Sequence, residues 1–455
     1  MRAWLRSKAA LGAALAVLLA YAAPAQALQI VRTKLSNGAI LLVSEQHQLP
    51  MVTVAIAFDA GSRHDPVGKA GLASLTAQCL EQGTRELTSA QFNRKIDFMG
   101  SSVSVGADSD WATASFKSLK RYTPQTLHLL AQVIMEPGLR DADILRKRAQ
   151  VVADIKAARE DPGYVASITF RKALFGAGPY GHPPEGEPGS VAKLTPEDVR
   201  DFYSSYYRLG SAVIAVVGDV KASEIKDTLD KELARPTGTV PAQTPPSAPV
   251  VPEGIHPTLV DRNIAQANVV LGFGGIARSN PDFYRLQVMN YILGGGGFAS
   301  RLVKSVRSKA GLAYSVASFF DADKFPGAFK VVLQTKNQSS NEALKLVVEQ
   351  LHAIQEKPVS PAELESAKKF LVGSFPLKLD RQSSIASFML GIELNHLGLD
   401  YADRYPKLIE AVTLEDVQRM ARKYLHPDAF ILVAVANQKV AAINLKQVAA
   451  EAKAN

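Results

Sequence analysis

The sequence predicts an α+β fold in which one unit, a largely antiparallel sheet covered by helices, is used twice. Three observations lead to this prediction: segments dense in β-branched residues, segments with helical periodicity, and a similarity between the two halves of the chain. The chain has 455 residues, and halves of about two hundred residues each are an ordinary domain size.

The expected strands are short apolar runs rich in valine and isoleucine. They are VTVAIAF from Val52, AVIAVVGD from Ala212, NVVLGF from Asn268 and FILVAVA from Phe430. The expected helices have apolar residues at helical spacing. They are LTSAQFNRKIDFMG (87–100), TPQTLHLLAQVIM (123–135) and DADILRKRAQVVADIKAARE (141–160). Asp161 and Pro162 are expected to end the last of these, because proline disfavours helix at the residue before it.

The two halves resemble each other in sequence. TPEDVRDFYSSYYRLGSAVIAVVGD, from Thr195, aligns without gaps with TLEDVQRMARKYLHPDAFILVAVAN, from Thr413. Both threonines are good helix N-caps followed by acids in the first turn. VTVAIAFDAGSR, ending at Arg63, likewise matches ANVVLGFGGIAR, ending at Arg278. Internal duplication explains both matches.

Composition divides the chain into four parts. Residues 1–27 have a basic start, an apolar run from Ala9 to Leu19 and the small-residue end Ala25-Gln26-Ala27, which predicts a signal peptide cleaved after Ala27. Residues 236–258 carry seven prolines and predict an extended linker. The remaining segments, 28–235 and 259–455, are the expected N-terminal and C-terminal domains. We expect an exported, periplasmic protein without a stable membrane anchor, since no later segment reaches the roughly 20 apolar residues of a membrane span.

Charge and cysteine content exclude some functions. The formal charge is +9, and loss of Arg2, Arg6 and Lys8 with the signal peptide leaves +6. No tract of lysine and arginine is interleaved with aromatic residues, so we expect no nucleic-acid partner. The single cysteine, Cys79, excludes an internal disulfide. A lone cysteine on the apolar side of a helix is typical of a core residue, not of a nucleophile.

Residues 61–84, GSRHDPVGKAGLASLTAQCLEQGT, resemble the signature helix of the pitrilysin (insulinase) metallopeptidases. That family binds zinc through an inverted His-x-x-Glu-His motif, and the three corresponding positions here are Ser74, Ala77 and Gln78. Hydroxyl and amide groups are poor replacements for imidazole ligands, and alanine cannot replace the glutamate that acts as general base. The resemblance places the third ligand at Asp154, within RKRAQVVADI, where the outer glutamate of the family pattern is Lys147.

We therefore expect no metal and no other cofactor in this chain. The alternative interpretation of Asp154 is an ordinary acid on a helix surface. The eight histidines offer no replacement site, because no two are spaced as metal ligands on one helix.

The second half contains NYILGGGGFASRLVKSVRSKAGLAYSVASFF, from Asn290 to Phe320. The four glycines Gly294, Gly295, Gly296 and Gly297 match neither a P-loop nor a dinucleotide fingerprint. The segment instead resembles the family's GGGxSSRLxxxVRExxGLAYSV, a substrate loop whose arginine and tyrosine bind substrate and stabilise the transition state. These positions are Arg307 and Tyr314, and Gly311 is expected to end the helix between them. Alternatively, Arg307 complements a helix C-terminus and Tyr314 only packs.

The resemblance covers nearly the whole mature chain and implies two pitrilysin-like halves. It also implies a role as the zinc-free subunit of a heterodimeric zinc metalloendopeptidase that cleaves peptides or unfolded polypeptides. The partner would be a homologous subunit with an intact His-x-x-Glu-His helix and the zinc. The alternative is an inert peptide-binding or scaffold protein of the same fold. An independent serine hydrolase is not supported, since no G-x-S-x-G elbow or S-x-x-K pair is present.

Overall fold

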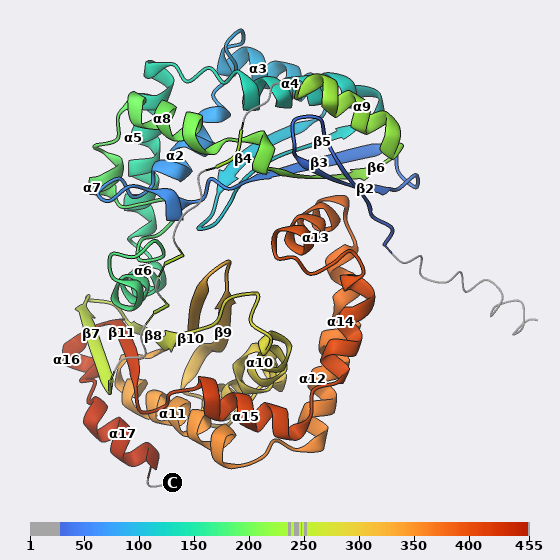
Figure 1. Cartoon of the computed structure of the whole chain (residues 1–455). Helices are drawn as coiled ribbons and strands as arrows, with labels where there is room; N and C mark the ends of the chain where they lie inside the picture. The colour runs from blue at the N-terminus through green and yellow to red at the C-terminus, as the bar shows by residue number, and fades with distance from the viewer. Residues whose placement is uncertain (1–27, 235–237, 241–244, 247, 250–252, 454–455) are drawn as a thin grey trace, which may run out of the picture.

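The computed structural model describes residues 28–234, 238–240, 245–246, 248–249 and 253–453 (Figure 1). The predicted signal peptide, residues 1–27, lies outside the described residues, as does part of the predicted linker 236–258. Strand β7, which belongs to the second half, begins at Ile255. None of the helices in the described ranges is long and apolar enough to cross a membrane.

The described residues of the first half form a six-stranded sheet in the order β1-β2-β6-β3-β5-β4. Its strands are β1 (Val31–Lys34), β2 (Ile40–Glu45), β3 (Met51–Phe58), β4 (Ser102–Ala107), β5 (Ala112–Leu119) and β6 (Val213–Gly218). β2 and β6 are parallel, with Ile40 opposite Val213, and the other neighbours are antiparallel.

The second half repeats this arrangement without a counterpart of β1. Its described strands form the order β7-β11-β8-β10-β9, and again one pair, β7 and β11, is parallel. The strands are β7 (Ile255–Asp261), β8 (Gln266–Gly274), β9 (Ala313–Ala322), β10 (Pro326–Lys336) and β11 (Phe430–Ala436). The predicted α+β class, with two largely antiparallel sheets covered by helices, is confirmed.

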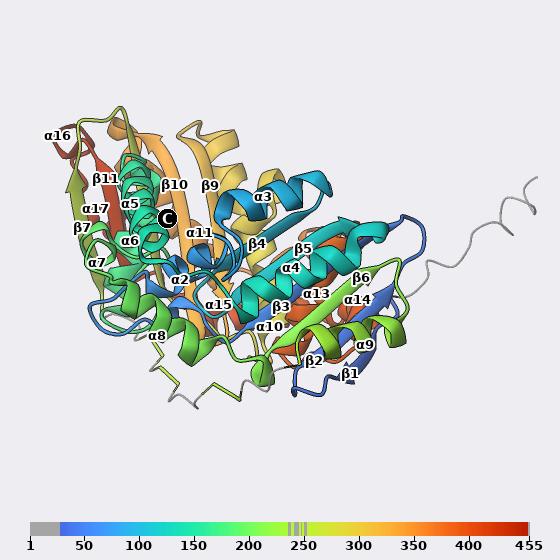
Figure 2. The same ribbon diagram turned by 90° about the horizontal axis from the view of Figure 1, so that it is seen from above.

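Helices follow the strands in the same order in both halves, as expected of a duplicated unit (Figures 1 and 2). The first half contains α2 (Leu72–Leu80), α3 (Ser89–Phe98), α4 (Thr123–Met135), α5 (Asp141–Ala158), α6 (Pro162–Phe175), α7 (Pro188–Val191), α8 (Pro196–Tyr206) and α9 (Ala222–Glu232). The second contains α10 (Phe283–Asn290), α11 (Ser340–Glu356), α12 (Pro361–Ser374), α13 (Gln382–Leu394), α14 (Tyr401–Glu410), α15 (Leu414–Tyr424), α16 (Gln438–Ala441) and α17 (Leu445–Lys453).

The predicted strands and helices are found as β3, β6, β8, β11, α3, α4 and α5. Thr195 and Thr413 cap α8 and α15, and each forms a capping box with the aspartate three residues on. α5 ends at Ala158, before Pro162, as predicted. Pro162 also occupies the first turn of the next helix, α6. The Asp161 carboxylate caps the N-terminus of α6.

The central strands of each sheet, such as β3 and β6 in the first and β11 in the second, are buried on both faces, and side chains alternate between the two. On β3, Val52, Val54, Ile56 and Phe58 face the helices of their own half. Ala55 and Ala57 face the opposite side, where they meet Ile385, Ala386, Met389 and Leu390 of α13. A helix of the second half therefore covers the first sheet.

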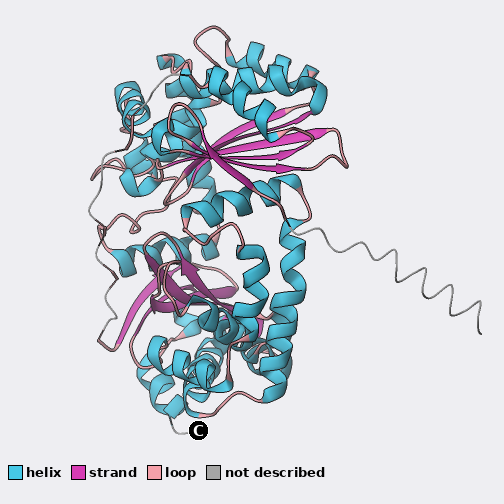
Figure 3. Ribbon diagram, turned by 45° about the vertical axis from the view of Figure 1, so that its right-hand side comes forward, coloured by secondary structure: helices cyan, strands magenta, loops and turns pink. Residues whose placement is uncertain are grey.

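The reverse exchange occurs at the second sheet. Ala166, Phe170 and Leu174 of α6 pack against β8, β10 and β11, chiefly on Val270, Ile431 and Val433. Gly272 of β8 leaves room for Phe170, since a Cβ there would lie 3.0 Å from the tip of the ring. Figures 1 and 3 show both helices in the layer between the two sheets.

We predict that Phe170→Ala destabilises the whole protein by about 3 kcal/mol, because it empties the contact between α6 and the second sheet. The measurement is the free energy of unfolding in urea. Phe98→Ala is the matched control: that ring is 82% exposed, and its removal should change stability by less than about 0.5 kcal/mol. Equal effects of the two substitutions would contradict a structural role for α6.

Candidate functional site

Helix α2, which carries the degraded motif, begins at a buried carboxylate. Asp65 accepts hydrogen bonds from the backbone N–H groups of Gly71 (2.7 Å) and Ala73 (2.8 Å). Gly71 has φ of 95°, a left-handed conformation that favours glycine. Burial raises the pKa of Asp65 to about 7, although the backbone donors oppose the rise. The start of α2 is thus fixed by groups outside the motif.

Polar but neutral side chains occupy the two histidine positions of the motif. The Gln78 amide donates to the Ser74 hydroxyl over 3.3 Å, one helical turn away. Ser74 is buried, Gln78 is half-buried and Ala77 is fully buried between them. The two side chains are joined by this hydrogen bond, and they offer neither an imidazole lone pair nor a general base.

The third position, Asp154, is exposed on α5. Lys147 of the same helix is half-buried. Burial raises the pKa of Glu81, the residue after α2, and the positive charge of Lys147 opposes that rise. A cation beside this helix disfavours a divalent metal. Among the residues that the structure describes, no group of three or more His, Cys, Asp or Glu side chains could hold a metal ion.

Cys79 lies in the core of the first half. Burial raises the pKa of its thiol to about 12. Because the thiolate is the nucleophilic form, a thiol in this environment is chemically inert.

Arg307 and Tyr314 lie on consecutive elements of the second half. Arg307 belongs to a π-helix (Val303–Lys309), Gly311 follows with φ of 66°, and Tyr314 is the second residue of β9. The predicted order of helix, terminating glycine and strand is therefore confirmed, although the helix is of the π type. Both side chains are exposed, Tyr314 at 70%, so each is available to a bound molecule.

Sequence reasoning did not single out Phe298, which is 73% exposed. The guanidinium carbon of Arg307 lies 5.1 Å from the centre of its ring, a cation–π contact. The contact joins the glycine-rich loop to the π-helix and restricts the guanidinium. An aromatic residue directly after the four glycines was the available signal.

The glycine run makes close backbone contacts. Gly294 and Gly295 end a π-helix (Tyr291–Gly295), and a Cβ at Gly294 would lie 2.5 Å from the Ser318 hydroxyl of β9. Gly296 approaches the Tyr291 carbonyl equally closely, and Gly297 has φ of 54°. Close packing at Gly294, Gly295 and Gly296 and the positive φ of Gly297 thus account for the run without a phosphate ligand.

Arg301 anchors the same loop to α12. Its guanidinium donates two hydrogen bonds to the Glu363 carboxylate, over 2.7 and 2.9 Å. The bond to Arg301 is the main reason that the pKa of Glu363 falls to about 2. Such a two-point ion pair fixes direction as well as distance, and so it supports the loop that carries Phe298.

A polar cluster that sequence reasoning missed joins the two halves. We call it the junction cluster: Asp59, Arg63, His64, Asp110, Tyr180 and Lys324. Asp59 pairs with Arg63, with His64 over 2.9 Å and with Lys324 of the β9–β10 turn over 3.4 Å. Asp110 accepts from the Tyr180 hydroxyl over 2.6 Å and from the Lys324 backbone N–H over 2.9 Å. The available signal in the sequence was the pair of acids in DSD, residues 108–110, which includes Asp110.

Electrostatics keep Asp59 of the junction cluster charged. Burial alone would raise the pKa of Asp59, but the hydrogen bond with His64 and the charges of Arg63 and Lys324 outweigh it and lower the value to about 2. Burial lowers the pKa of His64, which favours its neutral form. Gly61 allows the approach of the loop, since a Cβ there would lie 2.3 Å from the Asp110 carbonyl carbon.

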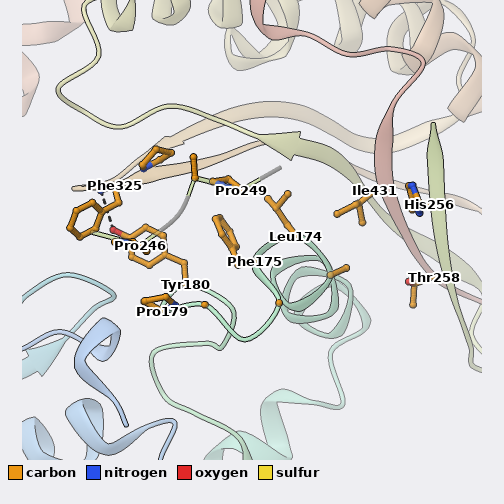
Figure 4. Close-up of a pocket in the computed structure, with 15 residues that line it drawn as sticks. Leu174, Phe175, Pro179, Tyr180, Pro246, Pro249, His256, Thr258, Phe325 and Ile431 are labelled. Atoms are coloured by element: carbon orange, nitrogen blue, oxygen red, sulfur yellow. Dashed lines mark hydrogen bonds between the residues drawn. The ribbon is translucent and has the colours of Figure 1, made fainter. Parts of the chain in front are cut away.

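Two cavities flank the junction cluster. A polar one of about 450 Å³ includes Asp110, Trp111, Arg171 and Asp323 in its lining. Burial and neighbouring carboxylates raise the pKa of Asp323 to about 6. An apolar one of about 680 Å³ lies beside the C-terminal end of α6, where Phe175, Tyr180, Pro246 and Pro249 gather (Figure 4).

Comparison with known proteins gives consistent matches along the chain. The model of the insulinase family (peptidase family M16) matches residues 41–181, and that of the peptidase M16 inactive domain matches residues 193–371. The crystal structure of a peptidase M16 inactive domain from Pseudomonas fluorescens has a TM-score of 0.83 and 29% identity, covering 90% of this chain and 98% of that one.

Two named relatives differ in what their names state. The non-peptidase homolog YmxG of Helicobacter pylori is 26% identical over 406 residues, covering 88% of this chain and 92% of the relative. The probable mitochondrial-processing peptidase subunit beta of Arabidopsis thaliana is 24% identical over 418 residues, covering 89% and 77%. The chain is thus similar to a protein named as no peptidase and to one named as a peptidase subunit.

The first prediction from the site concerns Asp59. A lowered pKa means that the carboxylate contributes stability above about pH 4, and that this contribution is lost as the pH falls towards 2. Asp59→Asn should therefore cost about 2 kcal/mol at pH 7, and the difference from the unsubstituted protein should shrink between pH 4 and pH 2. Urea unfolding at each pH measures it, with exposed Asp97→Asn as the control. A pH-independent difference would contradict the assignment.

The second prediction concerns the zinc positions. The combined substitution Ser74→His, Gln78→His and Asp154→Glu should create zinc binding near one ion per chain, because it restores two imidazoles at i, i+4 and a longer carboxylate. The natural chain should retain no zinc after gel filtration. Elemental analysis of both proteins provides the test, with Ser74→His alone as the control. Stoichiometric zinc in the natural chain would contradict the prediction that its residues at the motif positions cannot hold zinc.

Proposed function

Because the chain belongs to the peptidase M16 (insulinase) family, we propose that it is the zinc-free complementing subunit of a heterodimeric zinc metalloendopeptidase. Its partner is a homologous subunit with an intact His-x-x-Glu-His helix, which supplies zinc and the general base. This chain supplies Arg307 and Tyr314 for substrate binding and transition-state stabilisation. The substrate class is peptides or unfolded polypeptides.

One contrast between the two halves carries the proposal. The first half keeps the frame of the zinc helix but fills its chemical positions with the Ser74–Gln78 pair and Ala77. The second half presents an exposed arginine and an exposed tyrosine beside a closely packed glycine loop. Loss of one set with retention of the other is expected of a subunit that contributes half of a divided active site.

The retained groups suit peptide hydrolysis. The Arg307 guanidinium and the Tyr314 hydroxyl both donate to a substrate carbonyl oxygen or to the oxyanion that forms when water attacks it. The ring of Phe298 lies against the guanidinium and restricts its orientations before substrate arrives. Prior orientation reduces the entropy lost on binding.

The cellular setting belongs to the same proposal. The N-terminal segment has the composition of a cleaved signal peptide, so we place the mature chain in the periplasm. A relative named as a subunit of a processing peptidase supports a paired assembly. The name of the Helicobacter pylori relative, a non-peptidase homolog, supports inactivity of the isolated chain.

We predict that Arg307→Ala lowers kcat of the reconstituted pair about 100-fold, since removal of one oxyanion donor costs about 3 kcal/mol. The assay mixes the chain with a zinc-binding homologous subunit and follows cleavage of a fluorogenic peptide. Lys309→Ala is the matched control, because it removes an exposed cation two residues away. The control should leave kcat unchanged.

Two outcomes would contradict the proposal. Zinc-dependent cleavage by the isolated chain would make a partner unnecessary. Full activity of an assembled Arg307→Ala pair would favour the alternative, an inert peptide-binding or scaffold protein. Gel filtration of the mixed subunits separates loss of activity from loss of assembly.

A further inference from the structure

A second surface, on the outer side of the first half, has features of a binding site. A groove of about 920 Å³ runs between α3 and α4. Figure 1 shows these helices on the face of the first sheet opposite to α13, and Figure 2 shows the same helices from above. The groove therefore lies on the opposite side of the first sheet from α13, and Tyr314 belongs to β9 of the other sheet.

The groove has an apolar floor and an exposed aromatic edge. Met99 and Leu129 form buried parts of the lining. Phe98, the last residue of α3, is 82% exposed beside them, and Tyr122 lies at the start of α4. Burial of an exposed aromatic ring beside an apolar lining is favourable, so Phe98 favours a bound partner.

Positive charge surrounds the apolar lining. Arg94 and Lys95 are exposed on α3 and line the groove. Arg121 stacks on the ring of Tyr122, with its guanidinium carbon 4.8 Å from the ring centre. Two acids lie nearby. Glu232 forms a hydrogen bond of 2.8 Å with His128 of the lining, and Asp97 belongs to α3. Three cations against these two acids leave the rim basic.

We propose that this groove binds an amphipathic helix of another protein, with apolar residues at i, i+3 and i+4 and acidic residues beside them. The trough between two helices has the shape that accepts a third helix. The basic rim selects acidic flanks. Concavity distinguishes it from a lipid-binding surface, which presents its apolar residues outward on a convex or flat face. The binding is independent of the proposed peptidase function.

The test uses two labelled synthetic helical peptides with one apolar face in common, flanked by glutamate in the first and by lysine in the second. Fluorescence anisotropy with the full chain should give binding of the acidic peptide at least about tenfold tighter than that of the basic one. Phe98→Ser should weaken binding of the acidic peptide by a similar factor. Arg94→Glu combined with Lys95→Glu should reverse the preference.

Leu377→Ser is the matched control, since Leu377 is 71% exposed but lies in the second half. It should leave peptide binding unchanged, and the reconstituted peptidase activity of Phe98→Ser should equal that of the unsubstituted pair. Equal binding of both peptides, or none, would overturn the proposal. So would binding to phosphatidylglycerol vesicles, or self-association, that Phe98→Ser abolishes while the acidic peptide fails to bind.

Discussion

Each sheet of this protein has an apolar face that a helix from the opposite half covers, and the rest of the structure depends on this exchange. α13 lies on Ala55, Ala57 and Ala215 of the first sheet, whose small side chains let the helix approach closely. α6 lies on Val270, Ile431 and Val433 of the second. Neither half can bury its own sheet in full without the other. Both halves are therefore expected to unfold together.

The exchange also explains why the surroundings of the degraded zinc motif stay close to the family pattern. Gly61 and Arg63 belong to the junction between the halves, and Asp65 fixes the start of α2. These contacts need no metal. The motif positions Ser74, Ala77 and Gln78 are free to change because they hold none of the junction, whereas their flanks are constrained by packing and by buried charge.

Local signals made much of the fold predictable. The strand that begins at Phe430 and the helix from Thr123 to Met135 were found with the predicted bounds, and the capping threonines mark their helices because the signal lies within four residues. α6 was not predicted, since Pro162 was interpreted as the end of one helix and also begins the next. α13 is rich in apolar and small residues, and its partner is a sheet more than 160 residues away in sequence. Propensity carries no information on such contacts.

The candidate site likewise has a part that was predictable from the sequence and a part that was not. Gly311 predicted the order of elements around Arg307 and Tyr314, because a left-handed glycine ends a helix wherever the tertiary structure places it. The junction cluster was not predictable from spacing, since Asp59, Asp110 and Lys324 come from three separate segments. The π type of the helix that carries Arg307 also has no simple sequence signal.

The surface around Arg307 carries two exposed aromatic rings that the partner in the proposed pair would bury. Phe298 and Tyr314 are both more than two-thirds exposed. Phe298 contacts Arg307, and Tyr314 is the second residue of the strand that follows. Burial of two such rings against a partner contributes roughly 3 to 5 kcal/mol to the free energy of association. The isolated chain lacks this contribution. A cation that is already stacked loses little further entropy when a carbonyl oxygen arrives. In the proposed pair, burial by the partner would therefore use the same residues as binding of a peptide.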